Sequence, residues 1–528
     1  MQAGQTTKSI ELYETFVKEN QAHDFKILEE IAHILLSQGA ASTDEECQLL
    51  SMYGAGIAQT KEEIELYDLG ISSRNPMTQM ATIQFLRLVG DDRAEELLLK
   101  AFSSPFLIVR MEAAYALALR KSPVSTGIIE SLMQRLPPPF RIYFPELFAM
   151  IGSQDAIGIM KRLVGDHQLA VRLSTILAAA RFGRDDFLTT IRAGLTHKDN
   201  SELETCSTAA GFLKDSYSLP ALKKLALSSS ANVRLAACRS LSLLGEHSYR
   251  ETIIECARKK DPMAILLLGN IPNTEPLLIS LLKDYHFFIR VNAALSLLEK
   301  RDPACTATLI QMLLKDSRDL GFQPMSSQGN TLISWKVIPS STQYAKKTNR
   351  DIPSITLSLR ESILKQALEL PQESFLKIAQ AIFFHKQNDL IPLLVHLLEN
   401  LNSPEAIALL QEESRHVGTP FIRTYCHLAL YRLKAEGPHA EMLFKWIENK
   451  KGHELIRFRP LLPWTERQGT SSPYLLTPEE TSQLLIEGFQ TIADSHDIDG
   501  IRILVNAIGT GNSKNKYALA GLLLKAIQ

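Results

Sequence analysis

The chain has 528 residues, of which 45% are hydrophobic and 22% charged, so it is long enough for several domains or for one extended repeat array. Residues 1–100 hold 17 acidic and 8 basic residues, a net charge of −9, whereas the remainder holds 41 acidic and 49 basic residues. This acidic head on a mildly basic body disfavours a general nucleic-acid binder, which is basic over a whole face.

The cysteines and the chain start bear on the compartment. Six cysteines stand far apart without the spacing of zinc ligands, which is typical of a reducing compartment and of buried thiols that act as small apolar residues. The first residues lack the basic start and apolar core of a secretory signal, and no 18-residue apolar run occurs. These features predict a cytoplasmic protein. The alternative is export with a signal that is trimmed or not recognisable.

Taken in chain order, residues 1–71 read as helices of irregular spacing and, being acidic, suit an N-terminal cap. From residue 72 to 315 a repeat of about 31 residues follows. It is marked by an apolar residue followed by arginine in front of an alanine-rich run, at Val109-Arg110, Phe140-Arg141, Val171-Arg172, Val233-Arg234 and Ile289-Arg290. Slots near Leu203 and Met263 keep the apolar pattern without the arginine.

Each repeat is predicted to be a pair of helices. In the first helix Val109, Ala113, Ala116 and Leu117 recur at i, i+4, i+7 and i+8, which places them on one helical face. A second apolar helix follows after a short break. One pair cannot bury its apolar face, so pairs must stack. We expect the arginine in the first turns of the first helix, with its guanidinium on a loop oxygen.

This pattern resembles the HEAT-repeat family, in particular the short repeats first named from phycobilisome lyases. The resemblance is carried by residues 109–114 and by their relatives at 171, 233 and 289. It implies an all-α fold, an alpha-alpha superhelix of stacked helix pairs. Family members include scaffolds, adaptors, lyases and a few enzymes, so the resemblance says little about function.

The rest of the chain divides further. Residues 316–353 are rich in Ser, Gly and Pro and contain one strand-like piece, Thr331 to Ile338. We expect an irregular insertion there, further HEAT-like helix pairs over 354–449, with Ile422-Arg423 in the arginine slot, an irregular loop over 450–477 and C-terminal helices over 478–528.

Two segments superficially suggest chemistry. Gly509 to Lys516 contains glycines and lysines but no G-x-x-x-x-G-K-[ST] pattern, and Asp494 to Gly500 lacks the first and last ligands of a calcium-binding EF-hand. Both are interpreted as turns. The iron-binding and base-excision enzymes among HEAT-type proteins are disfavoured as well, since the one His-Glu pair, at 453–454, and the three tryptophans lie outside the regular array. We predict no catalytic residue, no cofactor and no metal site.

Two sets of residues are candidates for partner binding. Basic residues gather at the ends of second helices, which in HEAT-type solenoids usually line the concave face. These residues, called the basic ridge, are Arg162, Arg192, Lys223, Lys224, Arg258, Lys259 and Lys260. The alternative role of such cations is to offset the helix dipole, at about 0.3–1 kcal/mol each. The acidic head is a possible partner of the ridge within the molecule or in a second copy.

The second set, Arg457, Arg459 and Trp464, consists of residue types enriched in interfaces. The alternative is a loop whose aromatic side chains pack on the array. The sequence favours a non-catalytic scaffold that binds a protein or peptide of unknown identity along its curved surface. The alternatives are a lyase-like or enzyme-accessory protein that holds a small molecule in the concave groove, and a weak nucleic-acid binder. The oligomeric state stays open.

Overall fold

The computed structural model describes residues 6–58, 64–314, 320–324, 335–339, 352–451, 454–458 and 480–528. Within these ranges the regular structure is helical apart from one two-stranded hairpin. The helices form two compact units. Unit 1 comprises residues 1–117 and 391–528, and unit 2 comprises residues 118–390.

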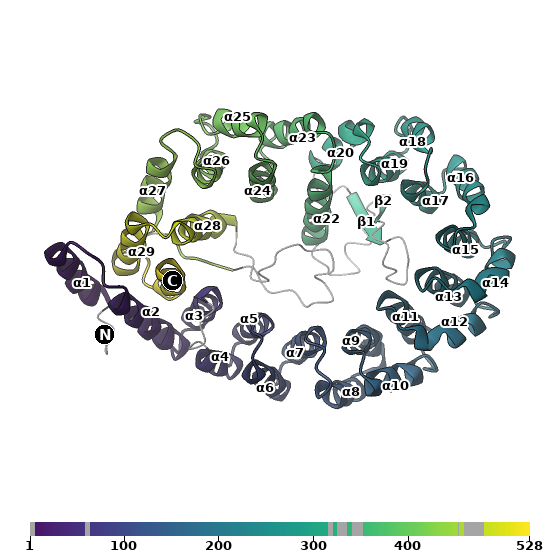
Figure 1. Ribbon diagram of the computed structural model, residues 1–528, viewed down its shortest axis with the longest axis horizontal. Helices are drawn as coiled ribbons and strands as arrows, with labels where there is room; N and C mark the ends of the chain where they lie inside the picture. The colour runs from purple at the N-terminus through teal and green to yellow at the C-terminus, as the bar shows by residue number, and fades with distance from the viewer. Residues whose placement is uncertain are drawn as a thin grey trace. The chain divides into compact units, whose positions relative to one another are not determined.

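Unit 2 is a run of short antiparallel helix pairs (Figure 1). Its helices are α8 (Ser125–Arg135), α9 (Phe144–Ile151), α10 (Gln154–Leu163), α11 (Leu169–Arg181), α12 (Leu188–Gly194), α13 (Asn200–Phe212), α14 (Leu219–Leu225), α15 (Ala231–Leu243), α16 (Arg250–Arg258), α17 (Pro262–Leu267), α18 (Glu275–Leu281), α19 (Phe287–Glu299), α20 (Thr306–Leu314), α22 (Ile352–Ala367) and α23 (Gln372–Phe384). The strands β1 (Leu320–Pro324) and β2 (Trp335–Pro339) pair antiparallel, with Phe322 opposite Val337.

First and second helices of the pairs form two rows in unit 2. The first helices α9, α11, α13 and α15 pack on one another in order, and the second helices α12 and α14 pack against α13 and α15. In Figure 1 the first helices lie on the inner side of the arc that this unit makes. The expectation that second helices line the concave side is therefore wrong for unit 2, because a repeat period predicts spacing and not the direction of curvature.

Small residues let neighbouring first helices approach closely. Ser240 of α15 is 1% exposed, and its hydroxyl donates a hydrogen bond of 2.7 Å to the Ser207 carbonyl of α13. A side chain at Gly211 would collide with Ser240, since a Cβ there would lie 2.4 Å from Oγ. A similar contact recurs two pairs further on, where Ser296 Oγ of α19 donates to the Ile265 carbonyl of α17 at 2.9 Å. These two hydroxyls join consecutive first helices through hydrogen bonds to backbone carbonyls.

The repeated arginines fasten each first helix to the loop before it. Arg172, Arg234 and Arg290 each occupy the fourth position of their helix, as predicted. Each donates from Nη1 to the backbone carbonyl six residues earlier, at 2.9 Å to Asp166, 2.6 Å to Ser228 and 2.8 Å to Asp284. The predicted bond to a loop oxygen is confirmed for these three arginines, and their role is structural.

The turn after each first helix contains a residue in the left-handed region. These residues follow at 31-residue intervals: Lys121 (φ 54°), Gly152 (66°), Gly183 (65°), Lys214 (52°) and Gly245 (92°). Short 3₁₀ turns then begin at Asp185, Ser216 and His247, also 31 residues apart. The repeat is thus a repeat of backbone conformation as well as of sequence.

One segment of unit 2 departs from the prediction, and another confirms it in part. Phe140 and Arg141 lie in a 3₁₀ turn (Pro138–Tyr143), and helix α9 begins only at Phe144, because consecutive prolines precede this slot. The predicted strand is confirmed in its second half by β2, whereas 331–334 lie outside the described residues.

Unit 1 combines the two ends of the chain. Its helices are α1 (Thr6–Asn20), α2 (Phe25–Ala40), α3 (Glu45–Ala58), α4 (Ile64–Ile71), α5 (Pro76–Leu86), α6 (Asp92–Lys100), most of α7 (Leu107–Leu119), α24 (Ile391–Leu401), α25 (Pro404–Glu413), α26 (Pro420–Arg432), α27 (His439–Lys450), α28 (Glu480–Ser495), α29 (Ile498–Thr510) and α30 (Lys516–Ile527). Helix α30 packs on α2 and α3, and α29 packs on α1.

The contact between the chain ends is close and partly charged. A Cβ at Gly521 of α30 would lie 1.9 Å from the Gly54 carbonyl oxygen of α3, so the two backbones touch. Beside them Lys514 forms ion pairs of 2.8 Å with Asp44 and 2.6 Å with Glu46. Two carboxylates of the acidic head, Asp44 and Glu46, therefore pair with a lysine near the C-terminus and not with the basic ridge.

Candidate binding surfaces

The basic ridge lies at the ends of α10, α12, α14 and α16, and much of its charge is paired across repeats. Arg192 holds Asp215 through two bonds, Nε to Oδ2 at 2.9 Å and Nη2 to Oδ1 at 2.7 Å. One period later Lys223 pairs with Glu246 at 2.7 Å. Lys260 pairs with Asp284 at 2.7 Å. In each case the carboxylate belongs to the following repeat, so these cations join repeats.

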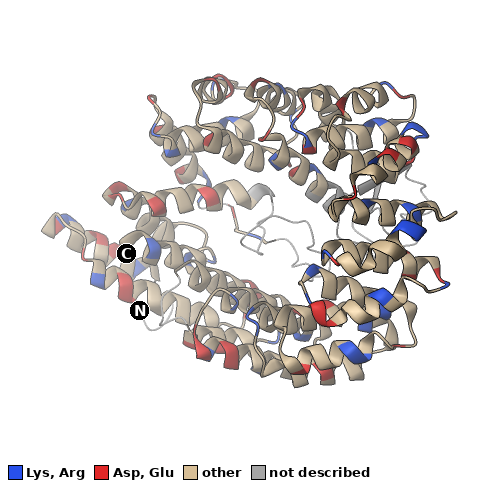
Figure 2. Cartoon of the chain, turned by 45° about the vertical axis from the view of Figure 1, so that its right-hand side comes forward, with Lys and Arg blue, Asp and Glu red and all other residues tan. Residues whose placement is uncertain are grey.

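Of the remaining ridge residues, two form ion pairs with described residues and two do not. Arg162 pairs with Glu130 of α8, and Arg258 pairs with Glu251 of its own helix at 3.1 Å. Lys224 and Lys259 form no ion pair within the described part of the chain. Figure 2 shows basic and acidic residues interleaved along the helices. Partner binding by the basic ridge stays a prediction, and among the described residues it depends mainly on the two lysines without an ion pair, Lys224 and Lys259.

Of the second predicted set, only Arg457 lies among the described residues. Its side chain is exposed, and its backbone N–H donates to Ser482 Oγ at 3.0 Å. The ring of the adjacent Phe458 packs on Tyr53 of α3, with centroids 4.7 Å apart. Arg459 and Trp464 lie outside the described residues, so their predicted role is untested.

The two segments interpreted as turns have structural partners. Asn515, in the loop before α30, is 1% exposed, accepts a hydrogen bond from the Ile456 N–H at 2.9 Å and donates to the Glu454 carbonyl at 2.8 Å. In the other segment Asp494 pairs with Lys525 at 2.6 Å and Asp499 with Arg502 at 3.2 Å. These groups are engaged in holding helices.

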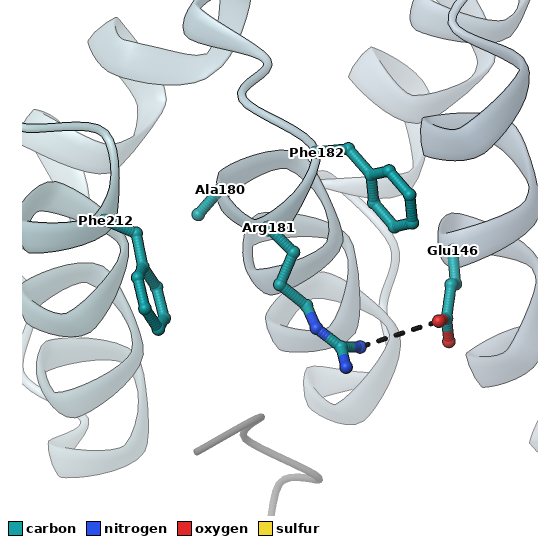
Figure 3. Close-up of a pocket in the computed structure, with 5 residues that line it drawn as sticks. All are labelled: Glu146, Ala180, Arg181, Phe182 and Phe212. Atoms are coloured by element: carbon teal, nitrogen blue, oxygen red, sulfur yellow. Dashed lines mark ion pairs between the residues drawn. The ribbon is translucent and has the colours of Figure 1, made fainter. Parts of the chain in front are cut away.

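A different surface emerges on the first helices of unit 2, which sequence reasoning missed. We call it the first-helix face and define it by Glu146, Arg181, Phe182, Phe212, Arg239 and Leu243. A hollow of about 400 Å³ lies between α9, α11 and α13, lined by Glu146, Ala180, Arg181, Phe182 and Phe212. Figure 3 shows the two phenylalanine rings on either side of Arg181.

The exposed apolar residues of this face lie where first helices end. Phe182 is 38% exposed and Leu243 is 50% exposed. Residues 181, 212 and 243 follow one another at one repeat period, so the face repeats with the fold. This spacing is the signal that sequence reasoning could have used, but the exposure of such residues depends on which row of helices faces outward.

The charges of the face are incompletely matched. Arg181 reaches Glu146 at 3.7 Å between Nη1 and Oε1, which is beyond hydrogen-bond distance (Figure 3). The Arg239 guanidinium lies over the Phe212 ring, 5.3 Å from its centroid. It has no hydrogen bond or ion pair with another described residue. Burial lowers the pKa of Arg239 to about 10, against the weaker opposing effect of Glu299.

Acidic groups limit what this face can bind. Glu204 of α13 stands four residues before Thr208 and eight before Phe212, so it lies on the same side of the helix as Thr208. Burial raises the pKa of its carboxyl group, while a hydrogen bond from Asn232 opposes the shift. The described residues contain no group of three or more His, Cys, Asp or Glu side chains placed to hold a metal ion.

Helix α26 carries another feature that the sequence did not indicate, a buried histidine pair. Nδ1 of His427 and Nδ1 of His439 in α27 are 3.0 Å apart, and both residues are less than 10% exposed. Burial lowers the pKa of His427 to about 4, with the nearby His439 and Arg423 acting in the same direction. His439 Nε2 is buried without a hydrogen-bond partner.

Comparisons with known proteins add little. No protein-family model and no curated protein sequence matches the chain. Among solved structures it is similar to a chain in a homology model of the full-length AP-3 complex in an intermediate open conformation, at 12% identity over 98% of this chain and 93% of that one, with a TM-score of 0.30. It is also similar to a crystal structure of an engineered protein, at 14% identity over 78% of this chain and 99% of that one, with a TM-score of 0.21.

TM-scores of this size carry no argument about fold or function, so the evidence for the fold is the helices themselves. In the described ranges no helix has the length and apolar character needed to cross a membrane. The stacked pairs, their shared left-handed turn and their repeated arginine bonds make the chain an all-α helical repeat protein.

Proposed function

We propose that this chain is a HEAT-like, non-catalytic scaffold that binds a partner protein or peptide across the first-helix face of unit 2. The observation that carries the proposal is the pair of partly exposed apolar side chains Phe182 and Leu243, at the ends of the first helices α11 and α15, together with the hollow that Phe182 and Phe212 line. Exposed apolar side chains grouped at the ends of neighbouring helices are typical of surfaces that partners cover.

The geometry of helix packing suits an extended segment. Packed helices lie about 8–10 Å apart, and an extended chain advances about 3.3 Å per residue. A segment that crosses the first helices would therefore pass one repeat about every three residues. Its apolar side chains would meet the ends of α11, α13 and α15 in turn.

Site-specific photo-crosslinking tests the proposal. The photoreactive residue p-benzoylphenylalanine replaces Phe182 or Leu243, and the matched control replaces Leu227, which is 84% exposed in the turn after the second helix α14. In a lysate of the source organism we expect the same partner band from the first two positions and not from the control. Equal labelling from Leu227, or no band from Phe182 and Leu243, would contradict the proposal.

The hollow also favours a second candidate, an accessory protein that holds a small molecule. Its volume of about 400 Å³ lies in the range of small-molecule sites. Native mass spectrometry of the purified chain distinguishes the two. A bound molecule that is lost in Phe182→Asp would favour this candidate over the scaffold.

A further inference from the structure

Arg239 is the charged group on the first-helix face whose surroundings satisfy it least. Its guanidinium lies over the Phe212 ring, 5.3 Å from the ring centroid, and that ring forms one wall of the hollow. Among the described residues no carboxylate or carbonyl oxygen bonds to it. A partly buried guanidinium that lacks a hydrogen-bonded anion is costly in the free protein and is relieved when a carboxylate binds.

The surroundings of Arg239 select the kind of anion. The other arginine of this face, Arg181, lies two first helices away on α11 and reaches Glu146 only at 3.7 Å. The carboxylate of Glu146 lines the hollow and repels a doubly charged phosphate more than a singly charged carboxylate. The aromatic walls at Phe182 and Phe212 offer space for an apolar side chain beside that carboxylate.

We propose that Arg239, which lies over the Phe212 ring, binds a carboxylate side chain of a partner peptide, while a neighbouring aromatic or large aliphatic side chain of that peptide fills the hollow between Phe182 and Phe212. This inference rests on the proposed function and specifies its partner, a segment in which Asp or Glu stands within a few residues of Phe, Trp or Leu.

A random library of 12-residue peptides displayed on phage and selected on the full-length chain tests this chemistry. We expect the selected peptides to be enriched in Asp or Glu close to an aromatic or leucine residue. Fluorescence anisotropy then compares each selected peptide with a version in which Asp and Glu are replaced by Asn and Gln. We expect the amide version to bind at least about tenfold more weakly, as for a lost charge-assisted bond.

Variants assign the effect to Arg239. Arg239→Gln should bind the acidic and amide peptides nearly alike, and Arg239→Lys, which keeps the charge without the planar guanidinium, should retain part of the difference. The matched control is Arg258→Gln, since Arg258 is an exposed arginine of α16 that pairs within its own helix. It should leave the ratio unchanged. Circular dichroism confirms that each variant is folded, and Arg239→Lys stands in if Arg239→Gln is not.

The outcomes separate this inference from the proposed function. Selected peptides that are apolar without acidic enrichment, and that need Phe182 but not Arg239, would overturn the carboxylate site and leave the scaffold intact. An unchanged acid-to-amide ratio in Arg239→Gln would overturn it too. If no peptide is selected, the inference fails, and photo-crosslinking from Phe182 and Leu243 decides the proposed function by itself.

Discussion

Lys214 occupies a turn position that glycine fills in three equivalent repeats, at Gly152, Gly183 and Gly245. All four adopt a positive φ, which costs an L-residue roughly 1–2 kcal/mol and costs glycine nothing. The turn after a first helix thus imposes its conformation even where the sequence does not favour it. Tertiary packing of the two flanking helices is what holds Lys214 there.

A pair of reciprocal substitutions tests this turn. Gly183→Ala should lower the free energy of unfolding by about 1 kcal/mol. Steric overlap plays no part, since a Cβ at Gly183 would have no neighbour within 4 Å. Lys214→Gly should be neutral or stabilising by a few tenths of a kcal/mol, because relief of strain is offset by the entropy of glycine in the unfolded chain. Urea unfolding of the two variants beside wild type measures both effects. A neutral Gly183→Ala would show that the turn tolerates a side chain.

The buried His427–His439 pair makes the stability of the fold depend on pH. Burial lowers the pKa of both imidazoles, that of His427 from 6.5 to about 4. The charge of Arg423 opposes protonation of His427, and a hydrogen bond to the backbone of Glu436 raises the pKa of His439 against the larger effect of burial. Between these pH values the unfolded chain binds more protons than the folded one, so stability falls as the pH falls from about 6.5 to about 4.

We expect His427→Gln to remove much of this dependence. The wild-type chain should lose on the order of 2 kcal/mol more than the variant between pH 7 and pH 4.5, as follows from 1.36 kcal/mol per pKa unit discounted for partial solvation. Thermal unfolding at several pH values measures the difference. His247→Gln, at an exposed 3₁₀ turn, is the control and should follow wild type. Parallel pH curves for wild type and His427→Gln would contradict the account.

At the scale of elements, the 31-residue repeat in the sequence predicted the positions of most first helices. The arginine positions mark the first helices α7, α11, α15 and α19, because a residue pair that recurs every 31 residues reports equivalent backbone positions. The residues Phe140-Arg141 were predicted to be in an α-helix and lie in a 3₁₀ turn. The prolines just before them lack the N–H groups that an α-helix needs, and the repeat period does not report this local effect. The direction of curvature, and hence the face that carries the hollow, depends on three-dimensional packing of side chains from many repeats.

Stacked pairs should lose stability locally when one is damaged. Ala236 of α15 is 7% exposed, and Ala236→Asp would bury a carboxylate against neighbouring first helices at a cost of several kcal/mol. Hydrogen exchange should rise mainly in α13, α15 and α17, since each pair touches chiefly its neighbours. Exchange that rises uniformly along the described helices, or not at all, would contradict a solenoid.

At the scale of the whole molecule, the sequence did not reveal how the chain ends are used. Helices over 478–528 were predicted, and α28, α29 and α30 fall there, but nothing in the period indicated that α30 packs on α2 and α3. Contacts between residues some 470 positions apart, such as Lys514 with Asp44, leave no periodic trace. The same holds for the candidate surface, where the spacing of residues 181, 212 and 243 is visible in the sequence and the exposure of Leu243 is not.

The contact between α30 and α3 allows a specific prediction for Gly521. A Cβ there would lie 1.9 Å from the Gly54 oxygen, so Gly521→Ala must push α30 away from α3 and should cost roughly 1–3 kcal/mol. The matched control is Gly158→Ala in the interior of α10, where a Cβ has no neighbour within 4 Å and alanine should stabilise the helix by about 0.5–1 kcal/mol.

Hydrogen exchange by mass spectrometry reads out both substitutions. Gly521→Ala should raise exchange in α2, α3 and α30, which form the contact, and leave α11, α13 and α15 as in wild type. Gly158→Ala should raise exchange in none of these helices. The contrast isolates the backbone contact, since both variants make the same chemical change inside a helix. If Gly521→Ala is as stable as Gly158→Ala and its protection pattern matches wild type, the ends of the chain are not held together by the close approach of Gly54 and Gly521.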